Sequence, residues 1–451
     1  MKQLSRGICM VALFVICGTT FTVVAQEAET GQESWKDYLK EIPLGPGTLN
    51  IGGSLRFRYE VYDNYNIKGY GTDETDNVLL ERLRLDFEYK LHENLHAFVQ
   101  LQDAHYWLSD LHVRDFSVIC PYENPLDVKK GYVQWTHIGD TPLGLRVGRQ
   151  AIAYRDSRVW GPGDWGNVGR YTWDAVTLYW DTEVVSADLI GAQRVLNDAD
   201  RFDEDHFDFD AYGLYARVKK LPFDLDLLYI QKYDDHGTTR GATGLGDLRT
   251  QSVGAYLNGT FQERIDWGGL AVYQFGDWGE DYIRAYGYNA RLGYTLDAPW
   301  TPRLGIEYSF GSGDSDPDDR KHETFDGLFG AVDKFYGRMN MFAWMNLEDC
   351  QASFSIKPTK SLKVSLDYHF LTLDENKDAW YYCSGKPQRQ DVTGRSGTTL
   401  GHEIDLFAKW QATDSLEFFC GYAHFSPGSF VRHTGEHSDA DWVFFQTTLF
   451  F

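Results

Sequence analysis

A set of arginine side chains is the part of this sequence best suited to binding chemistry. Arg56 and Arg58 alternate with apolar residues in one segment, and Arg82 and Arg84 do so in the next. Four more arginines lie in a glycine-rich stretch from Arg149 to Arg170. A polyanion that enters a narrow passage loses water, and fixed positive charge offsets that loss. We therefore expect anion binding by Arg56, Arg58, Arg82, Arg84, Arg149, Arg155, Arg158 and Arg170.

Acidic residues in the same segments leave a second interpretation open. Glu60, Asp86 and Glu88 share the polar faces of the two arginine-bearing segments. In a polar channel wall, charges of opposite sign also neutralise one another in ladders. The sequence therefore allows both a binding role and a neutralising role for these arginines.

The stretch from Arg149 to Arg170 follows one alternating segment and precedes another, so it is a connecting loop. Its Gly and Pro content suits a chain that folds into the interior of the protein, and functional residues concentrate in loops. We expect this loop to form a constriction. The alternative is a loop that packs on the rim.

Other motif matches lack the structural context that their chemistry needs. Gly161, Gly163 and Gly166 have the spacing of a dinucleotide-binding loop, but no βαβ unit surrounds them. His433-x-x-Glu-His437 resembles a zinc-protease motif, which requires a helix, whereas the intervening glycine indicates a loop. The acidic run 314–319 does not follow the EF-hand pattern. Together with the acidic run 198–210, it motivates a hypothesis of weak divalent-cation binding. We expect no enzyme, no cofactor and no defined metal site.

Alternating segments along the whole chain predict the strands that position these residues. Apolar and polar residues alternate at 54–61, 82–91, 362–370 and 403–410, among other places. A period of two with one polar face indicates half-exposed strands. Short connectors alternate with long ones, such as the long loop expected at 63–77. The pattern predicts an all-β fold, a transmembrane antiparallel β-barrel of about eighteen strands with short periplasmic turns and long external loops.

The carboxyl terminus supports the barrel. The last alternating segment ends on Phe451, with Phe445, Thr447 and Leu449 on the same face. A chain that stops on an aromatic residue resembles the terminal strand of bacterial outer-membrane barrels, and a tilted strand of about 9–11 residues spans the hydrocarbon. We expect Phe451 at the periplasmic rim, facing lipid. The alternative, an edge strand of a soluble sheet, would expose several aromatics to aggregation.

The amino terminus predicts export. Lys2 and Arg6 precede an apolar run from Ile8 to Val15, and small residues follow at the expected cleavage positions. We predict a signal peptide at 1–25, a short periplasmic segment at 26–47 and the barrel at 48–451. No segment approaches about 18 uninterrupted apolar residues, which excludes an α-helical membrane protein.

Composition narrows the partners. Aromatic residues make up 16% of the chain, and the formal net charge is −23, which argues against nucleic acid as a partner. Four cysteines follow the signal peptide without zinc-site spacing. In an oxidising periplasm Cys350 and Cys383 would either pair or stay unpaired, and the sequence leaves both outcomes open.

Several longer stretches resemble the alginate export family of outer-membrane channels. They occur in order along the chain at Val147–Arg170, Trp173–Val176, Ser312–Asp319, Glu323–Phe329, Gly401–Leu406 and Gly421–Gly428. The resemblance implies an eighteen-stranded monomeric barrel in the bacterial outer membrane that passes an anionic polysaccharide. We expect contact with membrane lipid and lipopolysaccharide, and the sequence leaves open whether a periplasmic secretion partner supplies the polymer.

Two other functions stay open. One is a general or small-solute porin, which differs in cargo rather than in architecture. The other is a structural or adhesive outer-membrane protein with a blocked lumen. Single-channel conductance separates the last from the other two.

Overall fold

The computed structural model describes residues 35–116, 119–240 and 245–451. The predicted signal peptide and the expected mature start at Gln26 lie outside the described residues. The chain divides into two units, Met1–Tyr38 and Leu39–Phe451. In the first unit only Trp35–Tyr38 is described, where the short 3-10 helix η1 (Asp37–Leu39) begins. All further description concerns the second unit.

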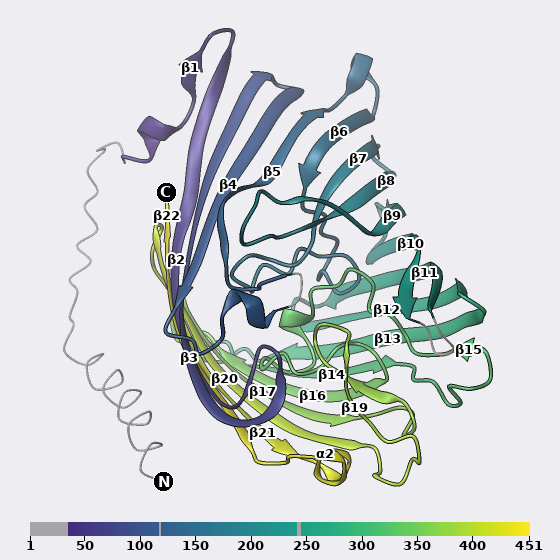
Figure 1. The fold of residues 1–451 in the computed structure, drawn as a ribbon. Coiled ribbons are helices and arrows are strands. Elements are labelled where there is room, and N and C mark those ends of the chain that lie inside the picture. Colours follow the sequence, from purple (N-terminus) through teal and green to yellow (C-terminus); the bar gives the residue numbers. More distant parts are fainter. Residues whose placement is uncertain (1–34, 117–118, 241–244) are drawn as a thin grey trace, which may run out of the picture. The chain divides into compact units, whose positions relative to one another are not determined.

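The second unit is a closed antiparallel barrel of 18 strands, as predicted. Each strand pairs with the next one in the chain, and the last strand pairs with the first between Ser54↔Phe450 and Asp63↔Asp441. In Figure 1 the colours follow this order, so that yellow β22 lies beside purple β2. Closure leaves the barrel without an unpaired edge, the usual solution for a sheet in lipid. The strands are β2 (Gly47–Asn66), β3 (Gly69–His92), β4 (Leu95–Trp107), β5 (Asn124–Trp135), β6 (Leu143–Gln150), β7 (Thr172–Asp181), β8 (Val185–Leu196), β9 (Glu204–Val218), β10 (Asp224–Arg240), β11 (Leu245–Phe261), β12 (Ile265–Trp278), β13 (Asp281–Thr295), β14 (Arg303–Gly311), β16 (Leu347–Ile356), β17 (Leu362–Thr372), β20 (Thr399–Thr413), β21 (Leu416–Pro427) and β22 (Ala440–Phe450).

Side-chain exposure follows the alternation that the sequence predicts. On β2, Arg56 and Arg58 are buried inside the barrel, whereas Phe57 between them is exposed on the outer face. Apolar side chains are exposed in the same way on most other strands, for example Leu189, Leu214 and Ile306. Successive side chains of a strand point to opposite faces, so one register fixes the whole division between lipid and lumen.

Short turns and long loops alternate around the barrel. One end has connections such as Glu93–Asn94 and Asp414–Ser415, and the other end carries the long loops. The prediction of a long loop at 63–77 is wrong, because β2 and β3 continue through this segment as a hairpin with its turn at Ile67–Lys68. The tip of this hairpin is held inward: Tyr70 packs on Trp380 at 5.7 Å between ring centroids.

The remaining elements lie at the two ends of the barrel. At the short-turn end, β1 (Ile42–Leu44) pairs with the start of β2, and η3 (Ile138–Asp140) lies in the β5–β6 turn. At the long-loop end are β15 (Lys321–His322), which pairs in parallel with β13, and the hairpin of β18 (Ala379–Tyr381) and β19 (Pro387–Gln390). The same end carries η2 (Val113–Asp115), η4 (Val332–Lys334) and α2 (Ser429–Thr434). Within the described ranges, no helix is both long enough and apolar enough to cross a membrane.

The hydrophobic core of the protein lies inside the barrel, toward the long-loop end. It combines lumen-facing strand residues with loop residues, among them Trp160, Phe329, Trp344 and Trp380, each no more than 1% exposed. Figure 1 draws these loops within the ring of strands. The outer half of the lumen is therefore narrowed by folded loops rather than by a separate plug domain.

The chain terminus lies at the short-turn end. The Phe450 backbone N–H donates to Ser415 O at 2.7 Å, and Phe451 exchanges two backbone hydrogen bonds with Gly53 of β2. The four cysteines among the described residues are all unpaired, so Cys350 and Cys383 form no disulfide. Cys350 is exposed on β16, whereas Cys383 lies in the loop between β17 and β20, which separates the two thiols.

Candidate functional site

The β6–β7 loop, residues 151–171, crosses the lumen. On one side Trp160 approaches Gly213 of β9 so closely that a Cβ there would lie 2.6 Å from the indole ring. On the other side Trp165 packs edge-to-face on Phe444 of β22, with ring centroids 5.1 Å apart. Strands β9 and β22 lie on nearly opposite sides of the ring, so this loop divides the interior.

The strand arginines hold this loop in place. Arg56 donates to Trp165 O at 3.2 Å, to Gly166 O at 3.3 Å and to Asn167 Oδ1 at 3.1 Å. Arg58 donates to Trp165 O at 2.7 Å, and its guanidinium stacks 4.0 Å from the centre of that indole. These contacts join β2 to the point where the loop comes nearest to the wall.

Strand β3 completes the arginine cluster. Arg82 donates to Asp164 O at 3.0 Å and to Gly166 O at 3.1 Å, and Arg84 pairs with the Asp164 carboxylate at 3.0 Å. Burial alone would raise the pKa of Asp164, but Arg84 and Arg82 hold that pKa well below its ordinary value. Asp164 therefore stays ionised and ties the loop to β3 by a charge-assisted bond.

The charges in this cluster do not balance. Arg58 pairs with Glu60 and Arg84 pairs with Asp164. The hydrogen bonds of Arg56 and Arg82 instead go to carbonyl and amide oxygens, which carry only partial negative charge. Arg56 and Arg82 therefore give the wall beside the loop a net positive charge.

The arginines of the loop itself, and Arg149 before it, bind other parts of the wall. Arg149 pairs with Asp174 at 3.0 Å. Arg155 pairs with Asp226 and, at 2.7 Å, with Asp224 of β10. Their positive charges are therefore largely offset by carboxylates. Their role in substrate binding stays a prediction.

Of the other two loop arginines, Arg158 is buried and Arg170 is half-buried, and both lie among aromatic and polar groups. Arg158 pairs with Glu307 of β14, donates to Tyr336 Oη at 2.9 Å, and lies 3.7 Å from the centre of the Phe335 ring. Arg170 donates to Cys383 O at 2.8 Å. The structure thus brings the strand arginines together in one cluster and spreads the loop arginines across the lumen.

Asn167 is the main site residue that the sequence reasoning missed. It is buried, and its amide NH₂ contacts Glu81 O and His105 O at 3.0 Å each and Tyr122 O at 2.8 Å. The sequence signal was the run Gly166-Asn167-Val168-Gly169 in the arginine-rich stretch, in which the asparagine has the pattern of an ordinary turn residue. Nothing in the local pattern indicates partners so distant along the chain.

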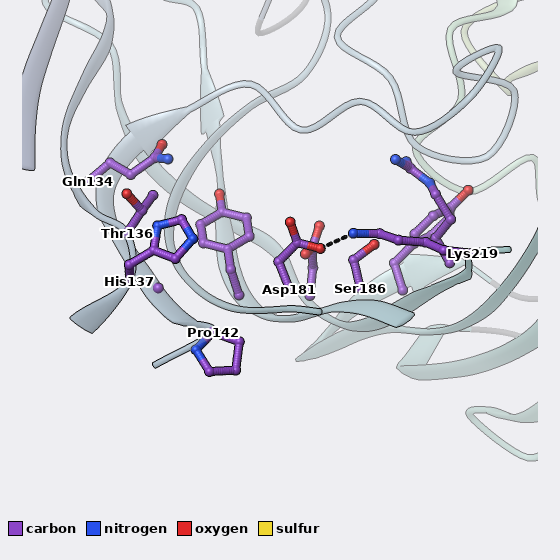
Figure 2. A pocket seen from close by; sticks show the side chains of 12 residues that line it. Gln134, Thr136, His137, Pro142, Asp181, Ser186 and Lys219 are labelled. Atoms are coloured by element: carbon purple, nitrogen blue, oxygen red, sulfur yellow. Dashed lines mark hydrogen bonds and ion pairs between the residues drawn. The ribbon is translucent and has the colours of Figure 1, made fainter. Parts of the chain in front are cut away.

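A polar cavity of about 300 Å³ lies on the inner wall at the short-turn end, below the loop. It is formed by β5 to β9 and their turns, and Figure 2 shows the side chains that line it, with Lys219 paired to Asp181. Tyr179, Asp188, Tyr215 and Arg217 complete its wall. The cavity therefore combines aromatic rings with groups of both charges.

Carboxylates of the β17–β20 loop accept hydrogen bonds from the acidic β14–β16 loop. Asp378 Oδ2 accepts from the Asp314 N–H at 3.0 Å and from Thr324 Oγ1 at 2.6 Å, and Asp374 accepts from the Gly313 N–H at 2.9 Å. Burial raises the pKa of Asp314 to about 7, and the nearby carboxylate of Asp378 acts in the same direction. Among the described residues, no three His, Cys, Asp or Glu side chains are grouped to hold a metal ion, so this geometry gives the divalent-cation hypothesis no support.

Comparisons with solved structures agree with this architecture. The chain is similar to OccAB4 of Acinetobacter baumannii, with 13% sequence identity, a TM-score of 0.59, and coverage of 89% of this chain and 98% of that one. It is also similar to OpdK of Pseudomonas aeruginosa in a structure with vanillate, at 12% identity, a TM-score of 0.58 and the same coverages. OprD of Pseudomonas aeruginosa matches at 12% identity with a TM-score of 0.52, covering 89% of this chain and 94% of that one. At these identities the similarity concerns the fold.

The sequence itself carries the family assignment. No curated protein matches the chain. The sequence model described as "Alginate export", however, matches residues 48–445, which is nearly the whole barrel. With the closed 18-stranded barrel and its lipid-facing outer surface, the match shows that this chain belongs to the alginate export family of non-enzymatic channels in the bacterial outer membrane.

Proposed function

We propose that this channel exports an acidic polysaccharide, and that the predicted arginines line its constriction. The observation that carries the proposal is the unbalanced charge beside the loop. Arg56 and Arg82 bind uncharged oxygens, so a carboxylate that passes the loop meets positive charge that no acidic partner in those contacts offsets.

The arrangement suits a polyanion because the arginines attract its carboxylates and the neighbouring acids allow the polymer to dissociate. Fixed guanidinium charge in a narrow, poorly hydrated passage offsets the cost of removing water from each carboxylate. The paired acids Glu60, Asp164 and Asp226 limit the depth of that attraction, so that successive units of the polymer can leave. In the same proposal the barrel works as a monomer among lipid and lipopolysaccharide, and a periplasmic partner delivers the polymer.

Ion selectivity in a planar bilayer tests the proposal. The reversal potential in a salt gradient should show a preference for anions, and Arg82→Gln and Arg56→Gln should each shift it toward cations. Arg320→Gln is the matched control, because Arg320 is exposed in an external loop and pairs with Glu280 at 2.9 Å. Charge at that exposed site is screened within about 8 Å in physiological salt, so the control should leave the potential unchanged. Cation preference in the unmodified channel would refute the proposal.

A small-solute channel is the second candidate function. Loops that narrow the lumen and a cavity of about 300 Å³ favour a cargo of one ring over a polymer. The OpdK structure contains vanillate, a small aromatic carboxylate. Conductance block by a polyuronate at concentrations where monomeric carboxylates have no effect would favour the polymer. Block by monomeric carboxylates at concentrations where a polyuronate has no effect would favour the small solute. Absence of any conductance would favour a structural or adhesive protein.

A further inference from the structure

We propose that the cavity at the short-turn end is a separate binding site for one sugar ring that carries a carboxylate, placed where a polymer first meets the channel. This cavity, here named the mouth pocket, is lined by residues of β5 to β9 and their turns, among them Gln134, Tyr179, Asp188, Tyr215, Arg217 and Lys219. The choice of ligand rests on the proposed function, whereas the pocket itself rests on the geometry that follows.

Arg217 is the anion-binding group of the mouth pocket. Its nearest carboxylate, Asp226, is 3.7 Å from Nε, which is longer than a hydrogen bond. Asp226 is fully buried and already accepts hydrogen bonds from Arg155 and, at 2.5 Å, from Tyr215. The Arg217 side chain is 46% exposed. Its guanidinium is therefore available for a ligand carboxylate, which this planar group can bind through two parallel bonds.

Lys219, the other cation of the pocket, is already engaged. Lys219 pairs with Asp181 and donates to Thr182 O at 2.8 Å, as Figure 2 shows for the ion pair. It closes one side of the pocket and leaves Arg217 as the positive group that faces an incoming ligand. The site thus takes one negative charge rather than several.

Hydrogen-bonding groups for sugar hydroxyls lie on the neighbouring strands. Asp188 accepts from Tyr154 Oη at 2.7 Å through Oδ2, and its Oδ1 can accept from a ligand. Gln134 accepts from Arg146 Nε at 2.7 Å through Oε1, and its NH₂ group can donate. The hydroxyls of Thr136 and Ser186 add groups that donate or accept.

Tyrosine rings give the pocket its apolar surface. Tyr215 stacks on Tyr154 with centroids 3.8 Å apart, which fixes its ring at the pocket wall. Tyr179 lies beside Arg146, whose guanidinium carbon is 5.5 Å from the ring centre. A volume of about 300 Å³ is at the low end for ligand sites, so the pocket suits one ring rather than a longer segment. Fixed rings, a half-exposed guanidinium and mixed donors and acceptors match a hydroxylated ring with one carboxylate.

Binding to the purified full-length channel in detergent tests the assignment. Calorimetry with a uronic-acid trimer should detect binding, and a neutral glucose trimer should bind at least tenfold more weakly. Arg217→Gln should weaken uronate binding about tenfold, and the affinity of Arg217→Lys should lie between those of Arg217→Gln and the unmodified channel. Lys220→Gln is the matched control, because Lys220 lies three residues away, outside the pocket, and pairs with Glu183 at 2.6 Å. Unchanged uronate affinity in Arg217→Gln, or tighter binding of 4-hydroxybenzoate than of the trimer, would overturn the assignment.

Side-specific block separates this inference from the proposed function. In a planar bilayer with channels inserted in one orientation, the trimer should block more strongly from one side, and Arg217→Gln should remove that asymmetry. Equal block from both sides in the unmodified channel would overturn the pocket assignment. If anion preference persists in that case, the proposed function stands without the pocket. If the unmodified channel shows side-specific block but no anion preference, the proposed function is refuted and the pocket assignment stands.

Discussion

Replacing Asn167 with alanine should release the lumen-crossing loop without unfolding the barrel. The Asn167 NH₂ group has two hydrogens shared among three carbonyl oxygens at 2.8–3.0 Å, and Oδ1 accepts one bond from Arg56 at 3.1 Å. These contacts amount to three hydrogen bonds. At about 1 kcal/mol net for each, Asn167→Ala should cost about 3 kcal/mol of loop stability. Since about 1.4 kcal/mol is a factor of ten, the open-loop population should rise on the order of a hundredfold.

Hydrogen exchange measures this population directly. The Arg170 and Tyr171 amides both donate to Pro162 O, at 2.9 and 3.0 Å, inside the loop. Their exchange should accelerate on the order of a hundredfold in Asn167→Ala, while amides in the barrel strands keep their rates. Asn376→Ala is the matched control, because Asn376 donates to Gly394 O at 3.0 Å in an external loop. An acceleration below about threefold at both amides would refute this account of how the loop is held.

Three further outcomes are expected. The pKa of Asp314 is raised from 3.8 to about 7, so the folded loop binds this proton more tightly than the unfolded chain does, and the stability of the loop should fall as the pH rises from about 4 to 7. Limited proteolysis of the loop should therefore be faster at pH 8 than at pH 5, and Asp314→Asn should remove this difference. Deleting Phe451 removes both backbone bonds to Gly53 at the closing strand pair and should impair assembly, so recovery of normal heat-modifiable protein would contradict it. Arg158→Leu leaves the Glu307 carboxylate with its hydrogen bond from Asn289 but without its cationic partner, and should lower the free energy of unfolding in vesicles by about 3–5 kcal/mol. An unchanged free energy of unfolding would contradict this prediction.

The alternation of residues was enough to predict the barrel, and the reason is physical. A strand has a period of two, so apolar positions such as Phe57 fix which neighbours face inward, and Arg56 and Arg58 follow from them. The hairpin at 63–77 was misread because its polar residues resemble a loop. Buried tyrosines at its tip, Tyr65 and Tyr70, supply the tertiary contacts that extend both strands.

The partners of the arginines could not be predicted from the sequence. Arg82 and Gly166 are 84 residues apart, and Arg56 and Asn167 are 111 apart, so no local pattern relates them. The loop was expected to narrow the lumen, and it does cross it. That the strand arginines would hold the loop depends on which wall the loop reaches, and only the closed fold determines that.

The position of Trp165 places the loop against the strand pair that closes the barrel, β2 and β22. Its ring lies under Arg58 of β2 and against Trp442 and Phe444 of β22, so one side chain touches both the first and the last barrel strand. These strands can meet only after every other strand is in place, which makes this contact a late step of assembly. Separating β2 from β22 would break the contacts of the Trp165 indole with one or both strands, so the loop adds to the stability of the strand pair that closes the barrel. A cargo that displaced the loop would also remove these Trp165 contacts with the first and the last barrel strand.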